Sequence, residues 1–388
     1  MSDFVFRINP NIIIGSYTVS RLGQQVREWG TRFFIVMDPI MRELKLAEKI
    51  MQSLSEHKVE TIVYSELSDG TSTKAVARAL KLAREAHVHG VIAVGGLKAL
   101  TIGRGVAAYY NEVHDFYTFV GGAQPNTQSI PCICVPTTYR FPFIFTNDLP
   151  IADSRNHQIK FLKIQQNVCR LALIDPNLML SLTDNQKATL SLELLSMAIE
   201  AYISQKANFF SDMFAEKAIE ILSYAFNGSP SIDMTTPEEV LLAQAGAMVS
   251  MAASTSSLGM STLLSIGINA RYQIKKPLIS SILLPYAMED AAKFKASKLE
   301  KLSKLIGAEK VSENESENPE SSDAVRDFID YVRQRSAAAN LPTRLKDTKL
   351  TIEQLAVVIE DIKETDIMNQ LPRSMTADDL FDFIKQAY

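Results

Sequence analysis

Short runs of β-branched and aromatic residues alternate with amphipathic helical patterns through the first half of the chain. One helical pattern lies within 73–89, where Val76, Ala79, Leu80 and Ala83 recur at the spacing of one helix face. Apolar strands that alternate with such helices predict a parallel sheet covered on both faces, in a doubly wound nucleotide-binding architecture. The strands are predicted at Asn11–Gly15, Phe33–Asp38, Thr61–Tyr64, Val91–Gly96, Cys132–Thr137 and Leu171–Asp175.

The second half of the chain has a different pattern. From Leu180 onward the strong helix formers Ala, Leu, Met, Glu and Lys dominate, and β-rich runs are few. The sequence therefore predicts a sheet domain over 1–178 and an all-helical domain over 179–388, with a ligand crevice between them. Segment 311–323 is polar and acidic, so we expect a mobile surface loop there. Helices are predicted at about 188–206, 212–226, 237–257, 259–270, 277–292, 296–305, 321–338, 351–362 and 376–387.

Composition excludes several classes of protein. The 388 residues are 46% apolar and 22% charged, which suits two domains that each bury a core. A net charge of −4 and the lack of a basic cluster argue against nucleic-acid binding. No apolar run approaches the roughly 20 residues that a bilayer requires, and the N-terminus lacks a signal-peptide pattern. We expect a cytoplasmic protein without a membrane partner.

The three cysteines are also consistent with a cytoplasmic location. Cys132, Cys134 and Cys169 are odd in number and are not spaced like a disulfide framework, which favours a reducing environment. We expect Cys132 and Cys134, which share one predicted strand, to point to opposite faces of the sheet.

A set of sequence landmarks in fixed order is more specific than any one motif. In this order and spacing they resemble the iron-containing alcohol dehydrogenases, whose relatives include glycerol dehydrogenase and dehydroquinate synthase. The resemblance implies an N-terminal Rossmann-like domain that binds a nicotinamide cofactor and an all-helical domain that holds a divalent metal. In that family the metal polarises the alcohol oxygen while hydride leaves for the nicotinamide. The landmarks are Val91–Gly96, Ile130–Thr138, Ala172–Leu178, Ala198–Ser204, Phe210–Asp212 and Leu341–Asp347.

The phosphate turn implied by the resemblance is altered in this chain. The family has three glycines and a serine, whereas here Gly95 and Gly96 are followed by Leu97 and Lys98. Such a turn presents free amides to a pyrophosphate at a helix N-terminus, and Lys98 could add a cation. The family's later lysine is replaced by Arg104. A tight structural turn that needs only the two glycines explains them equally well.

Two further strand ends complete the implied cofactor site. Asp38 ends a predicted strand, where a carboxylate can accept hydrogen bonds from the ribose and, by resemblance, favours NAD over NADP. A helix cap before Pro39 requires the same residue type, so both interpretations stay open. Thr137 and Thr138 match the family's threonine pair near the nicotinamide. The aromatic stretch 139–145 then replaces a glycine-rich one, and predicts an apolar lid or core segment, or else a reshaped substrate pocket.

The metal site implied by the resemblance lacks its histidines. All five histidines of the chain lie at or before His157, in the first half. The family uses an aspartate and three histidines of the helical domain, the first pair one helical turn apart. Alignment places Glu193, Met197, Thr262 and Lys276 at these positions, and Ile266 where the family has a proton-relaying histidine. Only Glu193 could ligate, so we expect no iron or zinc, and we expect Glu193 and Lys276 to pair with each other.

These patterns favour a family member without metal-dependent alcohol dehydrogenase activity that acts as a binding, regulatory or structural protein. No catalytic residue is assigned. A nucleotide or other small molecule in the crevice, a homodimer and a protein partner are the expected interactions. One alternative is a metal-independent NAD(P)-dependent alcohol or aldehyde oxidoreductase with Lys98, Arg140 or Lys276 as the electrophilic group. Another is an activity on an anionic sugar or phosphate held by Lys98, Arg104 and Lys276.

Overall fold

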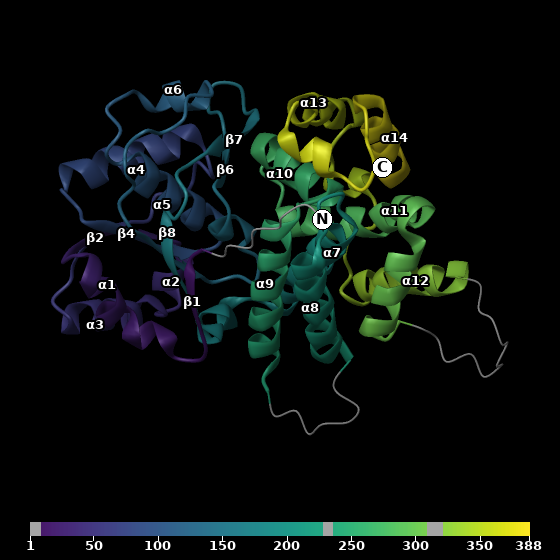
Figure 1. Cartoon of the computed structure of the whole chain (residues 1–388), viewed down its shortest axis with the longest axis horizontal. Helices are drawn as coiled ribbons and strands as arrows, with labels where there is room; N and C mark the ends of the chain where they lie inside the picture. The colour runs from purple at the N-terminus through teal and green to yellow at the C-terminus, as the bar shows by residue number, and fades with distance from the viewer. Residues whose placement is uncertain (1–8, 228–235, 309–320) are drawn as a thin grey trace. The chain divides into compact units, whose positions relative to one another are not determined.

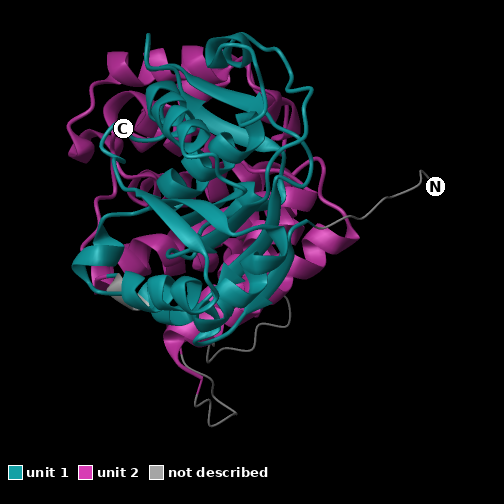
Figure 2. Cartoon of the chain, turned by 90° about the vertical axis from the view of Figure 1, so that its left-hand side faces the viewer, with its two compact units in different colours: residues 1–182 teal, residues 183–388 magenta. Residues whose placement is uncertain are grey.

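The structure is a computed structural model that describes residues 9–227, 236–308 and 321–388. It divides into two compact units, Met1–Leu182 and Thr183–Tyr388 (Figure 2). The sequence places this division after residue 178, at the change from alternating to purely helical patterns.

A six-stranded parallel sheet forms the centre of the first unit (Figure 1). All six strands that the sequence predicts are present, and every neighbouring pair is parallel. The strand order is β1-β8-β5-β4-β2-β3, so the chain runs outward from β2 to β3 and then returns to the other side of β2. The strands are β1 (Asn11–Ile14), β2 (Arg32–Met37), β3 (Glu60–Tyr64), β4 (Gly90–Gly95), β5 (Cys132–Pro136) and β8 (Cys169–Ile174).

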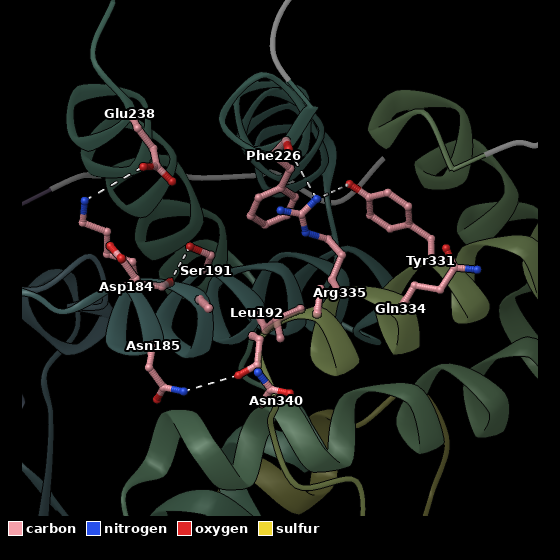
Figure 3. Close-up of a pocket in the computed structure, with 14 residues that line it drawn as sticks. Asp184, Asn185, Ser191, Leu192, Phe226, Glu238, Tyr331, Gln334, Arg335 and Asn340 are labelled. Carbon is pink, nitrogen blue, oxygen red and sulfur yellow. Dashed lines mark hydrogen bonds and ion pairs between the residues drawn. The ribbon is translucent and has the colours of Figure 1, made fainter.

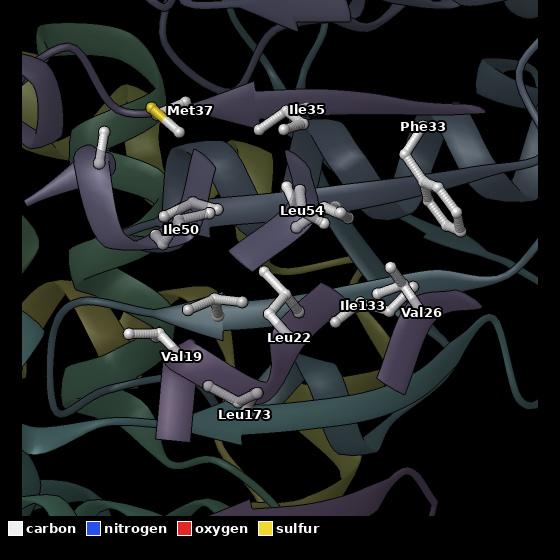
Figure 4. Close-up of a cluster of buried hydrophobic side chains, with 14 of the residues drawn as sticks. Val19, Leu22, Val26, Phe33, Ile35, Met37, Ile50, Leu54, Ile133 and Leu173 are labelled. Atoms are coloured by element: carbon white, nitrogen blue, oxygen red, sulfur yellow. The ribbon is translucent and has the colours of Figure 1, made fainter. Parts of the chain in front are cut away.

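Helices pack on both faces of this sheet, as the apolar strands predict. The short α1 (Leu22–Val26) and α3 (Ala47–Glu56) cover one face, where they bury Ile35 of β2 and Ile133 of β5 among other strand side chains (Figure 4). On the other face α5 (Leu97–Tyr109) packs so closely that a Cβ at Gly103 would lie 2.6 Å from the Cβ of Ala93. The remaining helices of the unit are α2 (Ile40–Glu43), α4 (Thr73–Glu85) and α6 (Phe116–Val120).

An antiparallel hairpin, β6 (Asp148–Ala152) with β7 (Ile159–Lys163), was not predicted. Pro150 lies inside β6, opposite Phe161, and proline within an apolar run argues against a strand in sequence reasoning. The proline is accommodated because this small sheet has only two strands. One edge of each strand therefore has no partner strand and needs no backbone N–H for pairing.

The three cysteines correct a prediction. Cys132 and Cys134 do not point to opposite faces, because their sulfur atoms lie 3.9 Å apart. Side chains alternate along a strand, so residues two apart share a face. Cys169 is the neighbour of Cys132 on β8, and all three thiols are free and buried. Burial raises the pKa of Cys169, and contact with Cys132 raises that of Cys134, which leaves both as unreactive core thiols.

The described part of the second unit contains helices and short helical turns but no strand, as predicted. The central helix α7 is buried on all sides from Thr189 to Ile203, which is typical of a core helix. Two predicted helices are one helix, α11, with a kink at Lys295 between them. The other helices follow the predicted ranges closely. The α-helices of the described part of this unit are α7 (Asp184–Ile203), α8 (Phe209–Asn227), α9 (Glu238–Thr255), α10 (Met260–Tyr272), α11 (Lys276–Ile306), α12 (Ser321–Ala338), α13 (Ile352–Ile362) and α14 (Ala377–Ala387).

Most of the predicted acidic loop at 311–323 lies outside the described residues, and its last three residues begin α12. Within the described ranges, no single helix is long and apolar enough to cross a membrane. Only α9 and α10 taken together reach that length and hydropathy, and they meet at an angle of 97°.

Candidate functional site

The predicted cofactor residues come together at the carboxyl ends of β2, β4 and β5. The Asp38 amide donates to the Val94 carbonyl at 2.9 Å, and the Thr137 amide donates to the Gly95 carbonyl at 3.1 Å. A Cβ at Gly96 would lie 3.5 Å from Cγ2 of Thr138. Strand connections leave in opposite directions at β2 and β4, and ligands of doubly wound sheets bind at such a switch point. Asp38, Gly95, Gly96, Thr137 and Thr138 therefore surround one candidate site.

Gly95 has no substitute in this turn. Its φ of 147° is unfavourable for other residues, and a Cβ there would lie 2.9 Å from the Cβ atoms of both Asp38 and Ala99. Gly96 is the N-cap of α5 and makes no side-chain cap. The first amides of α5 are thus left for water or an anion, which the helix dipole also favours. Both the structural and the phosphate-binding interpretations of the two glycines fit this geometry.

Lys98 and Leu97 form the first turn of α5. Lys98 is exposed, so its ammonium is free to approach an anion beside the turn. Leu97 is half-buried, where the family has a glycine.

Asp38 fits both interpretations that the sequence left open. Its Oδ1 accepts a long hydrogen bond of 3.4 Å from the Ile40 amide at the start of α2. Its Oδ2 accepts no hydrogen bond from another described residue, so one carboxylate oxygen remains for a ligand. The helix-cap interpretation therefore accounts for Oδ1 of Asp38 but not for Oδ2.

The aromatic stretch that follows Thr138 belongs largely to the core. Tyr139 and Phe141 are fully buried and Phe143 nearly so. The Phe143 ring packs against Phe161 of β7 with centroids 6.4 Å apart. Of the predicted interpretations, a core segment fits these side chains best.

Arg104 does not face a ligand, contrary to the anionic-substrate alternative. Its side chain is 1% exposed, and its guanidinium donates to the carbonyls of Thr146 and Asp148. Burial lowers the pKa of this arginine. Arg104 therefore anchors the chain that enters β6, and the alternative loses one of its three proposed cations.

The residues aligned with the family's metal ligands do not suit a divalent metal. Glu193 and Met197 lie one turn apart on α7 and are fully buried, and Thr262 is fully buried on α10. Lys276 is the half-buried first residue of α11. A thioether and an ammonium are poor partners for iron or zinc. Within the described ranges, no three His, Cys, Asp or Glu side chains converge as metal ligands would.

Sequence reasoning missed Glu200, the best-connected carboxylate of this region. Its oxygens accept hydrogen bonds from the amides of Gly259, Ser261 and Thr262 at 2.7–3.1 Å, and from the Thr262 hydroxyl at 2.6 Å. Burial raises its pKa even though these four donors favour the charged form. Glu200 thereby caps α10, and the Thr262 hydroxyl is committed to it. Glu200 belongs to the landmark Ala198–Ser204, but spacing along the chain could not reveal a partner 59 residues away.

The pairing of Glu193 with Lys276 stays a prediction. Helices α7 and α11, which carry the two residues, pack against each other. Replacing Glu193 by Gln lowers the free energy of unfolding if the pair exists, because the Lys276 ammonium loses its partner. An unchanged free energy of unfolding would refute the pair.

Comparison with known proteins matches both units to one family. Residues 9–176 match the family model of iron-containing alcohol dehydrogenases, and residues 187–388 match the model of that family's C-terminal domain. Lactaldehyde reductase of Escherichia coli K12 is 23% identical over 387 residues, which are 98% of each chain. The 1,3-propanediol dehydrogenase of Citrobacter freundii is 21% identical and covers 98% of this chain and 97% of its own. Among solved structures, a 1,3-propanediol oxidoreductase superposes with a TM-score of 0.89 at 19% identity over the full length of both chains.

Proposed function

The chain belongs to the iron-containing alcohol dehydrogenase family, and we propose that it acts as a nucleotide-binding protein without metal-dependent alcohol dehydrogenase activity. The observation that carries this proposal is the chemistry of the four metal-aligned residues. Met197 offers a thioether, Lys276 a cation, and Thr262 a hydroxyl already bonded to Glu200. Glu193 alone remains as an oxygen ligand, and one carboxylate does not hold a catalytic metal.

The nucleotide part of the proposal is supported by the switch point of the sheet. The first amides of α5 face a pyrophosphate, Lys98 adds a positive charge beside them, and Asp38 has an oxygen for the ribose hydroxyls. A carboxylate at that place would repel a 2′-phosphate, so the ligand is NAD or NADH rather than NADP. A bound nicotinamide would supply hydride transfer; the chain's own residues bind and orient the nucleotide.

A second candidate function is metal-independent reduction of an aldehyde with NADH. Thr137 donates to the Gly95 carbonyl and Thr138 lies beside Gly96, and by resemblance this threonine pair lies near the nicotinamide. Relatives are named as a lactaldehyde reductase and an NAD-dependent methanol dehydrogenase, which is alcohol and aldehyde chemistry. In this chain Lys98, Arg140 or Lys276 would stabilise the developing oxyanion in place of a metal.

The first experiment is calorimetric titration of the metal-free protein with NADH and with NADPH, followed by assays with and without added Fe²⁺ or Zn²⁺. We expect micromolar binding of NADH, weaker binding of NADPH, and no alcohol oxidation that depends on the metal. Metal-stimulated oxidation of ethanol or 1,2-propanediol would overturn the proposal. Reduction of lactaldehyde by NADH without metal would establish the second candidate instead.

The homodimer and the cytoplasmic location that the sequence suggests belong to the same proposal. Light scattering of the purified chain checks the dimer, with twice the mass of the 43.1 kDa chain expected. Cell fractionation checks the location.

A further inference from the structure

A cavity of about 860 Å³ lies within the helical unit (Figure 3). Asp184, Ala188, Ser191 and Leu192 line it from one face of α7. Glu193 and Met197 point to the other side of that helix, because they follow at the spacing of the opposite face. The opposing wall comes from α12 and the residues after it. The volume is within the range of small-molecule sites, and the cavity is separate from both the nucleotide turn and the metal-aligned positions.

Arg335 of α12 is the cation of this cavity. Its guanidinium carbon lies over the ring of Phe226, 4.1 Å from the centroid, and 5.7 Å from the centroid of the Tyr331 ring (Figure 3). Its hydrogen bonds are long, 3.4 Å to the Phe226 carbonyl and 3.5 Å to the Tyr331 hydroxyl. In the described part of the chain it makes no ion pair with a carboxylate. Stacking holds such a guanidinium ready for two parallel hydrogen bonds to a carboxylate.

The other charges in the cavity decide which ligand fits. Lys187 is already paired with Glu239 at 2.8 Å and lies 3.9 Å from Glu238, so it leaves little positive charge for a ligand. Asp184 lines the opposite wall from Arg335; it also attracts Lys187, but that ammonium is shared with Glu238 and Glu239, so the wall keeps an excess of negative charge. A dianion would be repelled by Asp184 and Glu238, and a simple cation by Arg335. A ligand with one charge of each sign matches both walls.

We propose that this cavity binds a small α-amino acid with an apolar side chain. The ligand carboxylate bonds to the guanidinium of Arg335 and its ammonium faces Asp184. Its side chain lies against Leu192, Ala188 and Ala338, which supply the apolar surface. Neutral amides of Gln334 and Asn340 complete the polar lining. The proposal does not depend on nucleotide binding at the sheet.

The test uses calorimetric titration of the full-length protein with L-leucine and two analogues. Leucinamide lacks the carboxylate, and 4-methylpentanoate lacks the ammonium. We expect L-leucine to bind, and each analogue to bind at least about tenfold more weakly, since each loses a charge-assisted contact. Equal binding of 4-methylpentanoate or of inorganic phosphate would overturn the amino-acid assignment. No heat from L-leucine up to millimolar concentrations would overturn the site itself.

Two variants and a matched control connect binding to the cavity. Arg335→Gln removes the cation and should weaken L-leucine binding by about tenfold or more. Ala338→Phe fills the cavity from an exposed position of α12, so it tests the site even where Arg335→Gln fails to fold. Arg333→Gln lies on the same helix but pairs with Glu289 and Asp330 outside the cavity, and should leave binding unchanged. Unchanged binding in both Arg335→Gln and Ala338→Phe would place the amino acid elsewhere.

Discussion

Two regions of the molecule differ in what they share with the family. At the carboxyl ends of β2, β4 and β5 the chain has the glycine turn that a phosphate requires, whereas α7, α10 and α11 are present as helices but carry no histidine. The turn at Gly95 and Gly96 survives beside a Leu97 and a Lys98 that depart from the family pattern. On the helices, Met197 and Thr262, which we align with family ligands, are fully buried, and Lys276 is half-buried. A phosphate is bound by backbone amides, which tolerate a change of side chain. A metal is bound by side chains, so on the proposal above the same degree of change would remove its site while the fold persists.

The largest effect is expected from restoring the family ligands on the helices. The combination Glu193→Asp, Met197→His, Thr262→His and Lys276→His should create a site that binds about one Zn²⁺ or Fe²⁺ per chain, because neutral imidazoles and a carboxylate suit these ions. Metal content after dialysis measures it. The matched control keeps three of the changes and leaves Met197 in place. A wild-type chain that itself retains one equivalent of metal would refute the contrast between the two regions.

Gly95→Ala should damage the sheet region most. The new Cβ would clash with Asp38 and Ala99 at 2.9 Å, at a φ of 147°. We expect the free energy of unfolding to fall by about 2–4 kcal/mol. We also expect most of the NADH binding to be lost. Urea unfolding and calorimetry measure the two losses. Gly122→Ala is the matched control, since its φ is 106° but no atom lies within 4 Å of the new Cβ. Equal losses in both variants would show that φ, and not the close approach to Asp38, requires the glycine.

Glu200→Gln probes the buried hydrogen bonds that join α7 to the start of α10. Both oxygens of the Glu200 carboxyl group can accept hydrogen bonds whether or not it is protonated, whereas the amide nitrogen of glutamine cannot accept, so we expect a loss of about 1–3 kcal/mol at acidic pH. The pKa of Glu200 is raised in the folded protein, so its favourable contribution is complete below the unfolded pKa of about 4.5 and declines as pH rises through the folded value. The stability difference between wild type and variant should therefore shrink with rising pH. A difference that grows instead would mean that the folded protein favours the charged carboxylate.

Lys98→Ala is expected to have the smallest effect. Lys98 is exposed at the start of α5, so its attraction for a phosphate is partly screened by water. We expect NADH binding to weaken about threefold to tenfold at low salt, and less at high salt, with the unfolding temperature unchanged. Calorimetry at two ionic strengths measures this. Lys74→Ala, an exposed lysine on the neighbouring helix α4, is the control. A loss that does not depend on salt would show that Lys98 acts through structure and not through its charge.

Sequence patterns were sufficient to predict a strand or helix where the pattern of its own residues defines it. Apolar runs predicted all six parallel strands: the inner strands β2, β4, β5 and β8 are buried almost throughout and so show no polar alternation, and the edge strands β1 and β3 still carry β-branched residues. Helix ranges in the second half followed from composition, and the break expected near 293–295 is the kink at Lys295. The hairpin β6–β7 was not predicted, because Pro150 interrupts the first strand and a proline within an apolar run argues against a strand. The prediction for the two thiols of β5 was wrong because it overlooked that residues two apart share a face.

The sequence alone determined the family, the order of the elements and the loss of histidines from the second half, since each depends on which residues occur and how they are spaced. Only the tertiary structure decided what individual polar side chains do. It buried Arg104 against the carbonyls of Thr146 and Asp148, and it joined Glu200 to Gly259 and Thr262. It also brought Arg335 onto Phe226, 109 residues away, at the edge of a cavity. A charged side chain has the same local pattern whether it faces water, a carbonyl or a ligand, and the difference arises only when distant segments pack together.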